Sequence, residues 1–258
     1  MSPTASAARA AALLLAAFCA GAAAQALYGI EPVVGQPGKD VVWVPSPHST
    51  VEKMLFLAAV TPRDTVVDLG SGDGRIVIAA AKIGARALGI EYNPDLVEYA
   101  RRAAEREGVS GRATFVQADI FQSDFSEATV VTMFLTSDVI LKLQPKLLAL
   151  RPGTRIVSNS FPAVGWDPDA TADEPLIGDC DIWCSALLWI VPANVAGTYE
   201  TQHGHVMLNQ KNQMLSGVLR AGGRVHELEG RVRGEEITFR AGRRKYHGRL
   251  VDGRLELR

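Results

Sequence analysis

The residues with the clearest chemical potential form a short glycine-rich and acidic stretch between an apolar run and a helix-like run. Its members are Asp68, Leu69, Gly70, Ser71, Gly72, Asp73 and Gly74. Glycines in such a turn let the backbone approach a ligand closely, because they carry no side chain that would block it. A glycine loop alone fits several cofactors, but the usual triphosphate-binding loop is excluded, since no Gly-Lys-Ser or Gly-Lys-Thr is present.

Carboxylates in and beyond this loop distinguish between the cofactors. A pyrophosphate at the start of the following helix would be repelled by Asp68 and Asp73, whereas a ligand with an ammonium and a sulfonium would be attracted. Glu91 follows the next strand-like run and can accept hydrogen bonds from both ribose hydroxyls. Asp119 follows the third and can accept one from an adenine amino group, while Ile120 covers the ring. These residues predict a cationic adenosyl cofactor rather than a dinucleotide.

The loop lies within an alternation of strand-like and helix-like segments. Strands are predicted at 65–69, 87–90, 113–117, 129–135 and 154–160, and helices at 75–83, 94–107 and 139–150, with a short helix between the third and fourth strands. A helix over 51–60, opened by a capping box that starts at Ser49, precedes them. The pattern predicts an α/β fold with a doubly wound, Rossmann-like parallel sheet, whose carboxyl edge gathers the acids.

The C-terminal third has a different pattern. An apolar run over 182–191 is followed by short strand-like segments that are separated by glycine turns. This pattern predicts a small antiparallel β-domain over 197–258, partly barrel-like. The α/β domain would then cover 27–193, beginning with an extended arm in which only 40–45 is strand-like.

The first 26 residues carry one charged side chain, Arg9, and an apolar run before Ala24-Gln25-Ala26. This is typical of a signal peptide over 1–26, so we expect a periplasmic or secreted protein. The run is shorter than the ~20 residues that span a bilayer, so no transmembrane helix is expected in the mature chain. If the start codon is misassigned, the protein is cytoplasmic. Cys180 and Cys184 would lie about 13 Å apart on an extended strand and are expected to be buried thiols.

Composition narrows the classes of function. The chain is 47% hydrophobic and 21% charged, as in ordinary globular proteins, and its formal net charge of -1 gives no electrostatic case for binding nucleic acid. His203 and His205 alternate on a predicted strand, but no third ligand accompanies them, so no metal site is expected. The basic residues near Arg243 fit an exposed edge strand.

Three segments resemble a known family: Trp43-Val44-Pro45-Ser46-Pro47, the loop from Asp68 to Arg75, and the run from Thr129 to Leu135. They resemble the seven-strand S-adenosylmethionine-dependent methyltransferases, and among these the small protein-lysine methyltransferases whose mitochondrial members act on the ATP synthase c-ring protein and the adenine nucleotide carrier. The resemblance implies S-adenosyl-L-methionine as cofactor. It also implies that Pro45 and Ser46 lie near this cofactor, that 68–74 holds its methionine part and that Glu91 holds its ribose.

Methyl transfer from a sulfonium needs positioning and, for an amine, a deprotonated nucleophile. The candidates for catalysis are Phe134, Asp138 and Asn159, after the fourth and fifth strands. Asp138 would orient the amine or else cap a helix that begins at Val139. Phe134, Phe161 and Trp166 would form an apolar wall around the methyl group, although core packing explains Phe134 equally well.

The expected function is therefore N-methylation of a lysine or another amine on a protein. The fourth strand lacks Asn-Pro-Pro-Tyr, which disfavours planar amide or adenine nitrogens as acceptors. Two alternatives remain open. In the first, the methyl acceptor is a small molecule or a lipid. In the second, the chain is a non-catalytic exported binding protein on a methyltransferase-like core, because S-adenosylmethionine is a cytosolic metabolite that an exported enzyme would lack.

Overall fold

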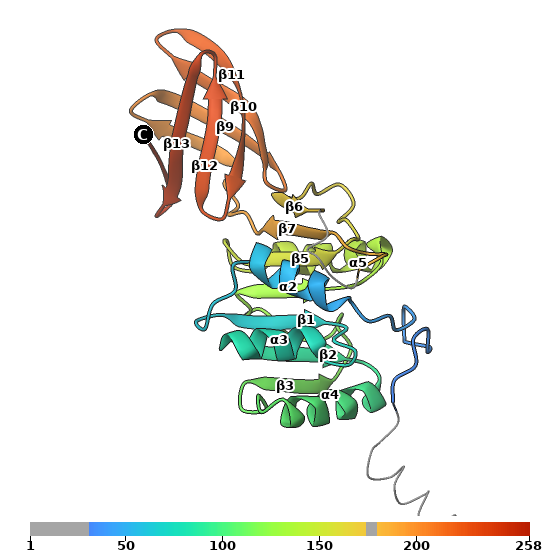
Figure 1. The fold of residues 1–258 in the computed structure, drawn as a ribbon. Helices are drawn as coiled ribbons and strands as arrows, with labels where there is room; N and C mark the ends of the chain where they lie inside the picture. Colours follow the sequence, from blue (N-terminus) through green and yellow to red (C-terminus); the bar gives the residue numbers. More distant parts are fainter. Residues whose placement is uncertain (1–30, 174–179) are drawn as a thin grey trace, which may run out of the picture.

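A computed structural model describes residues 31–173 and 180–258 of the chain, so the predicted signal peptide lies outside the described residues. The described chain forms two sheets of seven strands each, shown in Figure 1. The first sheet ends in sequence at Ile190, and the second begins at Gly197. None of the described helices is long and apolar enough to cross a membrane.

The first sheet has the strand order β3-β2-β1-β4-β5-β7-β6. Its strands are β1 (Thr65–Leu69), β2 (Arg86–Glu91), β3 (Ala113–Gln117), β4 (Val130–Met133), β5 (Arg155–Asn159), β6 (Ala170–Ala172) and β7 (Ala186–Ile190). Strands β1 to β5 are parallel, whereas β7 is antiparallel to both β5 and β6. The helices are α2 (His48–Leu57), α3 (Arg75–Ile83), α4 (Pro94–Arg106) and α5 (Ser137–Leu148).

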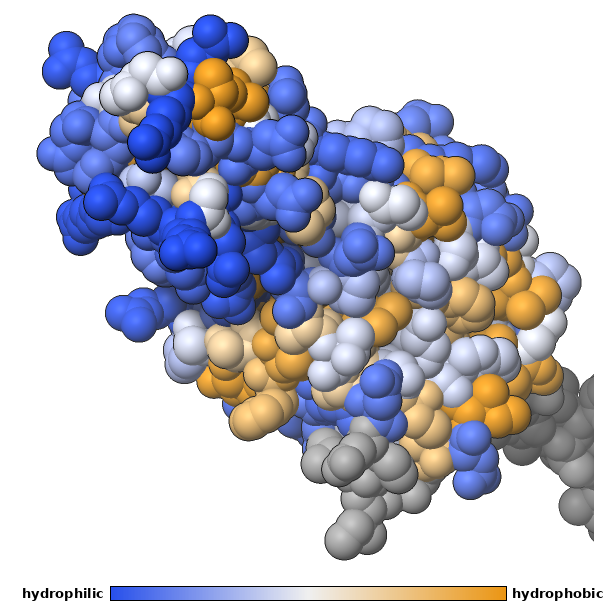
Figure 2. All heavy atoms as spheres, turned by 90° about the horizontal axis from the view of Figure 1, so that it is seen from above, coloured by the Kyte–Doolittle hydropathy of each residue, from blue (hydrophilic) through white to orange (hydrophobic). Residues whose placement is uncertain are grey.

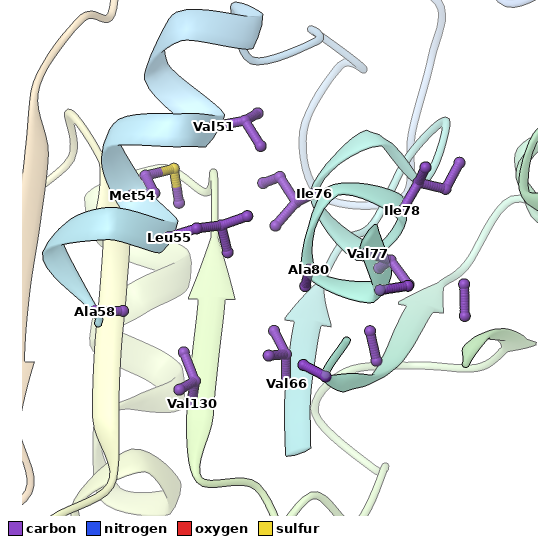
Figure 3. Packing of buried hydrophobic residues seen from close by; sticks show 14 of the residues in the cluster. Val51, Met54, Leu55, Ala58, Val66, Ile76, Val77, Ile78, Ala80 and Val130 are labelled. Atoms are coloured by element: carbon purple, nitrogen blue, oxygen red, sulfur yellow. The ribbon is translucent and has the colours of Figure 1, made fainter. Parts of the chain in front are cut away.

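Helices cover both faces of this sheet, as a doubly wound fold requires. On one face, α2, α3 and α4 pack against the strands, and Figure 3 shows Val51 and Leu55 of α2 pointing toward Ile76 of α3. On the other face, α5 buries Ile140 and Leu143 against β4 and β5. The apolar runs of the central strands are buried because both faces are covered. The predicted α/β class and its C-terminal β-domain are confirmed.

Local predictions around the sheet need correction. Helix α2 begins at His48 with Pro47 as its N-cap residue, so the capping box at Ser49 was wrong. The arm has no strand over 40–45, although Gly35 and Trp43 are joined by a backbone hydrogen bond of 2.8 Å. The chain between β3 and β4 has no helix. Residues 186–190 of the apolar run over 182–191 form β7, which pairs with β5 of the first sheet and lies within the predicted α/β domain over 27–193.

The prediction of two separate thiols was also wrong. Cys180 and Cys184 form a disulfide, with their Cα atoms 5.7 Å apart. The prediction assumed an extended strand, but residues 181–183 bend, and Trp183 has a φ of 61°. The chain therefore turns back on itself before β7 begins. We call residues 180–184 the disulfide loop.

The second sheet is an antiparallel meander. Its strands are β8 (Gly197–Thr201), β9 (Gly204–Lys211), β10 (Met214–Ala221), β11 (Arg224–Arg233), β12 (Glu236–Ala241), β13 (Arg244–Val251) and β14 (Arg254–Leu257), paired in sequence order. Alternate side chains fill one core that includes Leu219, Val232 and Phe239. The outward side chains are largely polar, and Figure 2 shows a mostly hydrophilic surface over this lobe.

The β-domain adjoins the β6–β7 side of the first sheet, far from β3 (Figure 1). Polar side chains of the β-domain contact residues 165–169, which precede β6 of the first sheet. Gln213 Nε2 donates to the Asp167 carbonyl at 2.6 Å, and Asn212 Nδ2 donates to the Gly165 carbonyl at 2.7 Å. Arg231 pairs with Asp169. These bonds come from the hairpin ends of the second sheet and leave the carboxyl edge of the first sheet open.

Candidate active site

A cavity of about 250 Å³ opens at the carboxyl ends of β1, β2 and β4. This is where the strand order reverses, since β2 and β3 continue on one side of β1 and β4 and β5 on the other. Open α/β sheets bind ligands at such a switch point. Five groups of residues form most of the lining of the cavity: the arm over 38–46, the glycine loop, the ends of β2 and β3, the residues after β4 and β5, and Trp183. Helices α3, α4 and α5 contribute the rest, namely Arg75, Ile76, Leu96 and Val139.

The glycine loop owes its shape to backbone angles that favour glycine. Gly70, Gly72 and Gly74 have φ values of 75°, 53° and 82°. A Cβ on Gly72 would lie 2.8 Å from Trp43 Cδ1. The arm can therefore cover the loop only if residue 72 has no side chain. A Cβ on Gly74 would instead meet Phe115 at 2.7 Å, and Gly74 does not line the cavity. Gly74 therefore permits the packing of α3 on the sheet.

Asp68 forms the floor of the cavity and is only 2% exposed. Thr132 Oγ1 donates a hydrogen bond of 2.7 Å to its carboxylate. The pKa of Asp68 is raised to about 7, chiefly by burial and also by the nearby charges of Glu91 and Asp73, while the hydrogen bond from Thr132 lowers it. Ser71 Oγ is also buried and has no hydrogen-bond partner within the described parts of the chain. The floor thus offers a carboxylate and a hydroxyl to a polar, cationic ligand.

Glu91 and Asp119 lie on the β2–β3 side of the cavity. Glu91 accepts hydrogen bonds from the backbone N–H of Gly72 and of Asn93, both at 2.9 Å. These bonds orient its carboxylate, and each oxygen keeps a further acceptor site. Asp119 accepts from the Phe121 N–H at 2.9 Å, and Ile120 lines the cavity beside it. The structure thus brings both acids to the edge predicted from the sequence.

Lys39 is a residue that the sequence did not single out. Its Nζ lies 2.6 Å from Asp119 Oδ2 and 5.2 Å from the centre of the Tyr92 ring. The hydrogen bond from this ammonium lowers the pKa of Asp119 below its ordinary value. Through this contact the arm reaches across the mouth of the cavity to the loop after β3.

Asp73 lines the cavity but already has a cationic partner. Arg75 Nε lies 3.0 Å from both of its carboxylate oxygens, and Arg75 Nη1 donates to the Ser46 carbonyl at 2.6 Å. The charge of Asp73 is therefore balanced within the chain, and the residue ties the arm to the glycine loop. Asp68 and Asp73 were both predicted to attract the cationic groups of the ligand. Because Asp73 is paired with Arg75, Asp68 alone keeps this role, on the floor of the cavity.

The structure separates the three residues that were predicted to act in catalysis. Phe134 lines the cavity, whereas Asn159 and Asp138 do not. Asn159 is fully buried, and its Nδ2 donates to Ser46 Oγ at 3.0 Å, so it holds the arm at Pro45 and Ser46, which line the cavity. Asp138 is exposed in the first turn of α5, which begins at Ser137 rather than Val139, so Asp138 is not its cap residue either.

The predicted aromatic wall has one different member. Trp166 is buried against Trp189 away from the cavity, with ring centres 6.1 Å apart. Its place is taken by Trp183 of the disulfide loop, whose ring centre lies 5.7 Å from that of Phe134. Phe161 lies 5.9 Å from Phe134 on the same measure. We call Phe134, Phe161 and Trp183 the aromatic end of the cavity. No sequence pattern pointed to Trp183, since its position depends on the bend in the disulfide loop.

The two histidines do not share a strand face. His203 lies in the turn between β8 and β9, and His205 on β9 has its Nδ1 2.6 Å from Glu200. Among the described residues, no group of three or more potential ligands that could hold a metal is present.

Comparisons with known proteins show the family of the chain. Residues 68–170 match the ANTKMT methyltransferase domain. A protein-lysine N-methyltransferase of Saccharolobus islandicus is 48% identical over 131 residues, which are 50% of this chain and 81% of the relative. An ATP synthase C-subunit lysine N-methyltransferase of Rattus norvegicus is 41% identical over 133 residues, and this chain spans only 61% of its length.

A solved structure adds the fold and a bound ligand. An RNA methyltransferase from Salinibacter ruber, in complex with S-adenosyl-L-homocysteine, is 47% identical and has a TM-score of 0.54. The match covers 59% of this chain and 96% of that one. Since the Saccharolobus islandicus relative is 48% identical and 81% of its length is covered, the chain belongs to the family of protein-lysine N-methyltransferases. It is an S-adenosylmethionine-dependent methyltransferase.

Proposed function

We propose that the cavity binds S-adenosylmethionine and that the chain transfers its methyl group to the side-chain amine of a lysine in a protein. The observation that carries the proposal is the division of the cavity, with the buried Asp68 on its floor, carboxylates on the β2–β3 side and aromatic rings on the β4–β5 side. When bound, the cofactor supplies a methyl group on a positively charged sulfur, which a neutral amine can displace in line.

The residues present fit this cofactor. Asp68, whose carboxylate has only a hydroxyl as its hydrogen-bond partner among the described groups, would pair with the ammonium of the methionine part. Glu91 would accept from the ribose hydroxyls, and Asp119 from the adenine amino group, with Ile120 against the ring. Ser71 Oγ, buried and unpartnered within the described residues, gains a polar partner. The glycines let the backbone approach.

The acceptor would enter at the aromatic end. Phe134, Phe161 and Trp183 exclude water from the reacting amine. Thr136, which is polar, also lines the cavity. None of these four side chains is ionisable at neutral pH. The amine therefore loses its proton to bulk water before it enters this end of the cavity, and not to one of these four side chains. The chain's part is to orient the neutral amine.

Two measurements on the purified chain test the proposal. Calorimetry with S-adenosylhomocysteine reports binding, and a labelled methyl group from S-adenosylmethionine reports transfer into protein, RNA, lipid and small-molecule fractions of a cell extract. We expect binding and label on protein lysine. Asp68→Asn removes the carboxylate on the floor, and Asp138→Asn is its matched control, because Asp138 is exposed and outside the cavity.

Other outcomes would replace the proposal. Label in RNA would favour the activity named for the Salinibacter ruber relative. Label in lipid or in small molecules would favour the second acceptor class that the sequence left open. Absence of S-adenosylhomocysteine binding by the unaltered chain would overturn both the cofactor and the reaction.

A further inference from the structure

Trp183 is a large aromatic residue that lies at a bend in the chain. It is 39% exposed and also lines the cavity. It lies within the disulfide loop, next to Cys184 and with a positive φ of 61°. That backbone angle is costly for a bulky residue and persists only where its surroundings enforce it. The loop is therefore held in this shape by other parts of the chain.

Helix α2 supplies the restraint beyond the disulfide. Lys53 Nζ donates to the Cys184 carbonyl at 2.6 Å, and Thr50 Oγ1 lies 3.4 Å from the Trp183 carbonyl. Both side chains are buried, with 4% and 0% of their surface exposed. The backbone on either side of the Trp183 ring is thus fixed by a covalent bond and by buried hydrogen bonds, while the ring itself remains accessible from the cavity.

The three rings of the aromatic end come from three separate segments. Phe134 follows β4, Phe161 follows β5, and Trp183 precedes β7, yet ring centres lie 5.7 Å and 5.9 Å from that of Phe134. Aromatic faces attract an ammonium that lies within about 6 Å, and a methylated ammonium remains cationic. An aliphatic chain ending in such a cation fits these rings better than an anionic or a planar acceptor does.

We propose that Trp183 is an acceptor-binding residue that selects a lysine side chain and its methylated forms, and that the disulfide loop holds it in place. This proposal rests on the proposed function, since it names how the same site recognises its acceptor. Trp183 completes the aromatic end from outside the matched domain at 68–170. A purely structural role would make Trp183 part of the core, but it is absent from the buried clusters.

The test compares Trp183→Ala and Trp183→Phe with Ile182→Ala, a matched control in the same loop that is 63% exposed and outside the cavity. For Trp183→Ala we expect the KM for the lysine substrate to rise roughly 2- to 30-fold, with kcat less affected and the Kd of S-adenosylhomocysteine unchanged. Trp183→Phe should recover most of the loss, and Ile182→Ala should match the unaltered chain. An unchanged KM in Trp183→Ala would overturn the proposal.

A second measurement does not need turnover. Nuclear magnetic resonance titration of the chain saturated with S-adenosylhomocysteine compares two probes, Nα-acetyl-trimethyllysine amide and its neutral tert-butyl isostere. We expect the cationic probe to bind roughly 2- to 30-fold more tightly, and Trp183→Ala to remove this preference. Equal binding of both probes by the unaltered chain would overturn the proposal even if lysine methylation is observed. If the preference is present but lysine is not methylated, the proposed function fails and the assignment of Trp183 stands.

The role of the disulfide has its own variant. Cys180→Ser combined with Cys184→Ser keeps the hydrogen bonds from Thr50 and Lys53 to backbone carbonyls but removes the covalent closure. We expect a rise in the KM for lysine that is smaller than in Trp183→Ala, and the same rise when the unaltered chain is reduced. An unchanged KM in both cases would overturn the assignment of the loop as the support of Trp183.

Discussion

Replacing Asp68 with asparagine should make the ligand-free protein more stable and the cofactor complex weaker. The asparagine would keep the shape of the side chain and can still accept the hydrogen bond from Thr132, so the substitution mainly removes a charge. Burial raises the pKa of Asp68 from its ordinary value of 3.8 to about 7. The folded chain therefore resists ionising a group that the cofactor requires in its ionised form.

The size of the effect on stability follows from this difference in pKa. Below about pH 4, Asp68 is protonated in both the folded and the unfolded chain, so its burial carries no cost of ionisation. As the pH rises to about 7, the carboxyl ionises more readily in the unfolded chain, and the folded state loses stability. A difference of about three pKa units corresponds to about 4 kcal/mol. Above pH 7, ligand-free Asp68→Asn should therefore be more stable than the unaltered chain by up to about 4 kcal/mol, and the two should converge toward pH 4.

The effect on binding has the opposite direction. With a pKa of about 7, Asp68 is about one tenth ionised at pH 6 and nine tenths ionised at pH 8, so S-adenosylhomocysteine should bind about tenfold more tightly at pH 8. At pH 6 binding should release close to one proton, which calorimetry in buffers of different ionisation enthalpy detects. In Asp68→Asn the affinity at pH 8 should fall roughly 30-fold or more and this pH dependence should vanish.

The assay combines denaturant unfolding of the ligand-free chain with calorimetric titration of S-adenosylhomocysteine between pH 5 and pH 8. A lower stability of Asp68→Asn than of the unaltered chain above pH 7 would refute the assignment of Asp68 as a destabilised buried carboxylate. Equal affinity and equal pH dependence of S-adenosylhomocysteine binding in the two proteins would refute its role in holding the ligand. Asp138→Asn, an exposed substitution, should leave both quantities unchanged.

Two further substitutions test the surroundings of the cavity, and a third tests the opposite, amino edge of the sheet. Lys39→Met frees the Asp119 oxygen that Lys39 now occupies, so S-adenosylhomocysteine should bind up to about fivefold more tightly by calorimetry, and weaker binding would show that Lys39 assists the ligand. Gly72→Ala should weaken this binding at least about tenfold, because its Cβ would lie 2.8 Å from Trp43 Cδ1, and adding Trp43→Ala should restore part of the affinity. Asp64, the residue before β1, accepts hydrogen bonds from the Thr61 N–H and from Thr129 Oγ1, both at 2.7 Å, and pairs with Arg155. Asp64→Asn should therefore destabilise the chain at neutral pH by roughly 1–3 kcal/mol in denaturant unfolding. Although burial alone would raise the pKa of Asp64, hydrogen bonds lower it overall, so this deficit should disappear as the pH falls below that pKa.

The sequence predicted the parts of the site that follow from strand order. Once the chain alternates between strands and helices, a parallel sheet puts every strand end at one edge, and Asp68, Glu91 and Asp119 must gather there. The glycines at 70 and 72 were equally predictable, because a positive φ is a local property of the backbone. Neither inference required knowledge of side-chain contacts between distant segments.

The remaining parts depend on loops whose paths no local pattern determines. Lys39 reaches Asp119 only because the arm folds back over the sheet, and Asn159 turns away from the cavity because Ser46 of the same arm accepts its hydrogen bond. Asp138 was misplaced because α5 begins earlier than the apolar pattern indicated. Trp183 could not be distinguished from Trp166, since both follow β5 in irregular segments and only the disulfide bend brings Trp183 to Phe134.

The disulfide also bears on where the protein works. We propose that the chain is exported, because residues 1–26 have the pattern of a signal peptide and because disulfides persist mainly in oxidising compartments. After fractionation of cells that produce the full chain, we expect a periplasmic or secreted protein that begins after Ala26. Mass analysis after alkylation should find Cys180 and Cys184 protected.

Cytoplasmic protein with both thiols alkylated would contradict export, and a cytoplasmic chain that lacks the leader-like segment would favour a start codon downstream of it. The exported form also raises the question of cofactor supply, since S-adenosylmethionine is made in the cytosol. Mass spectrometry of small molecules that the exported protein releases on denaturation tests whether it carries the cofactor. Bound S-adenosylmethionine or S-adenosylhomocysteine would show that the enzyme acts with its cofactor after export. If the exported chain binds neither compound even when it is added, the Asp68 site does not serve this cofactor there, and the alternative of an exported binding protein replaces the enzyme.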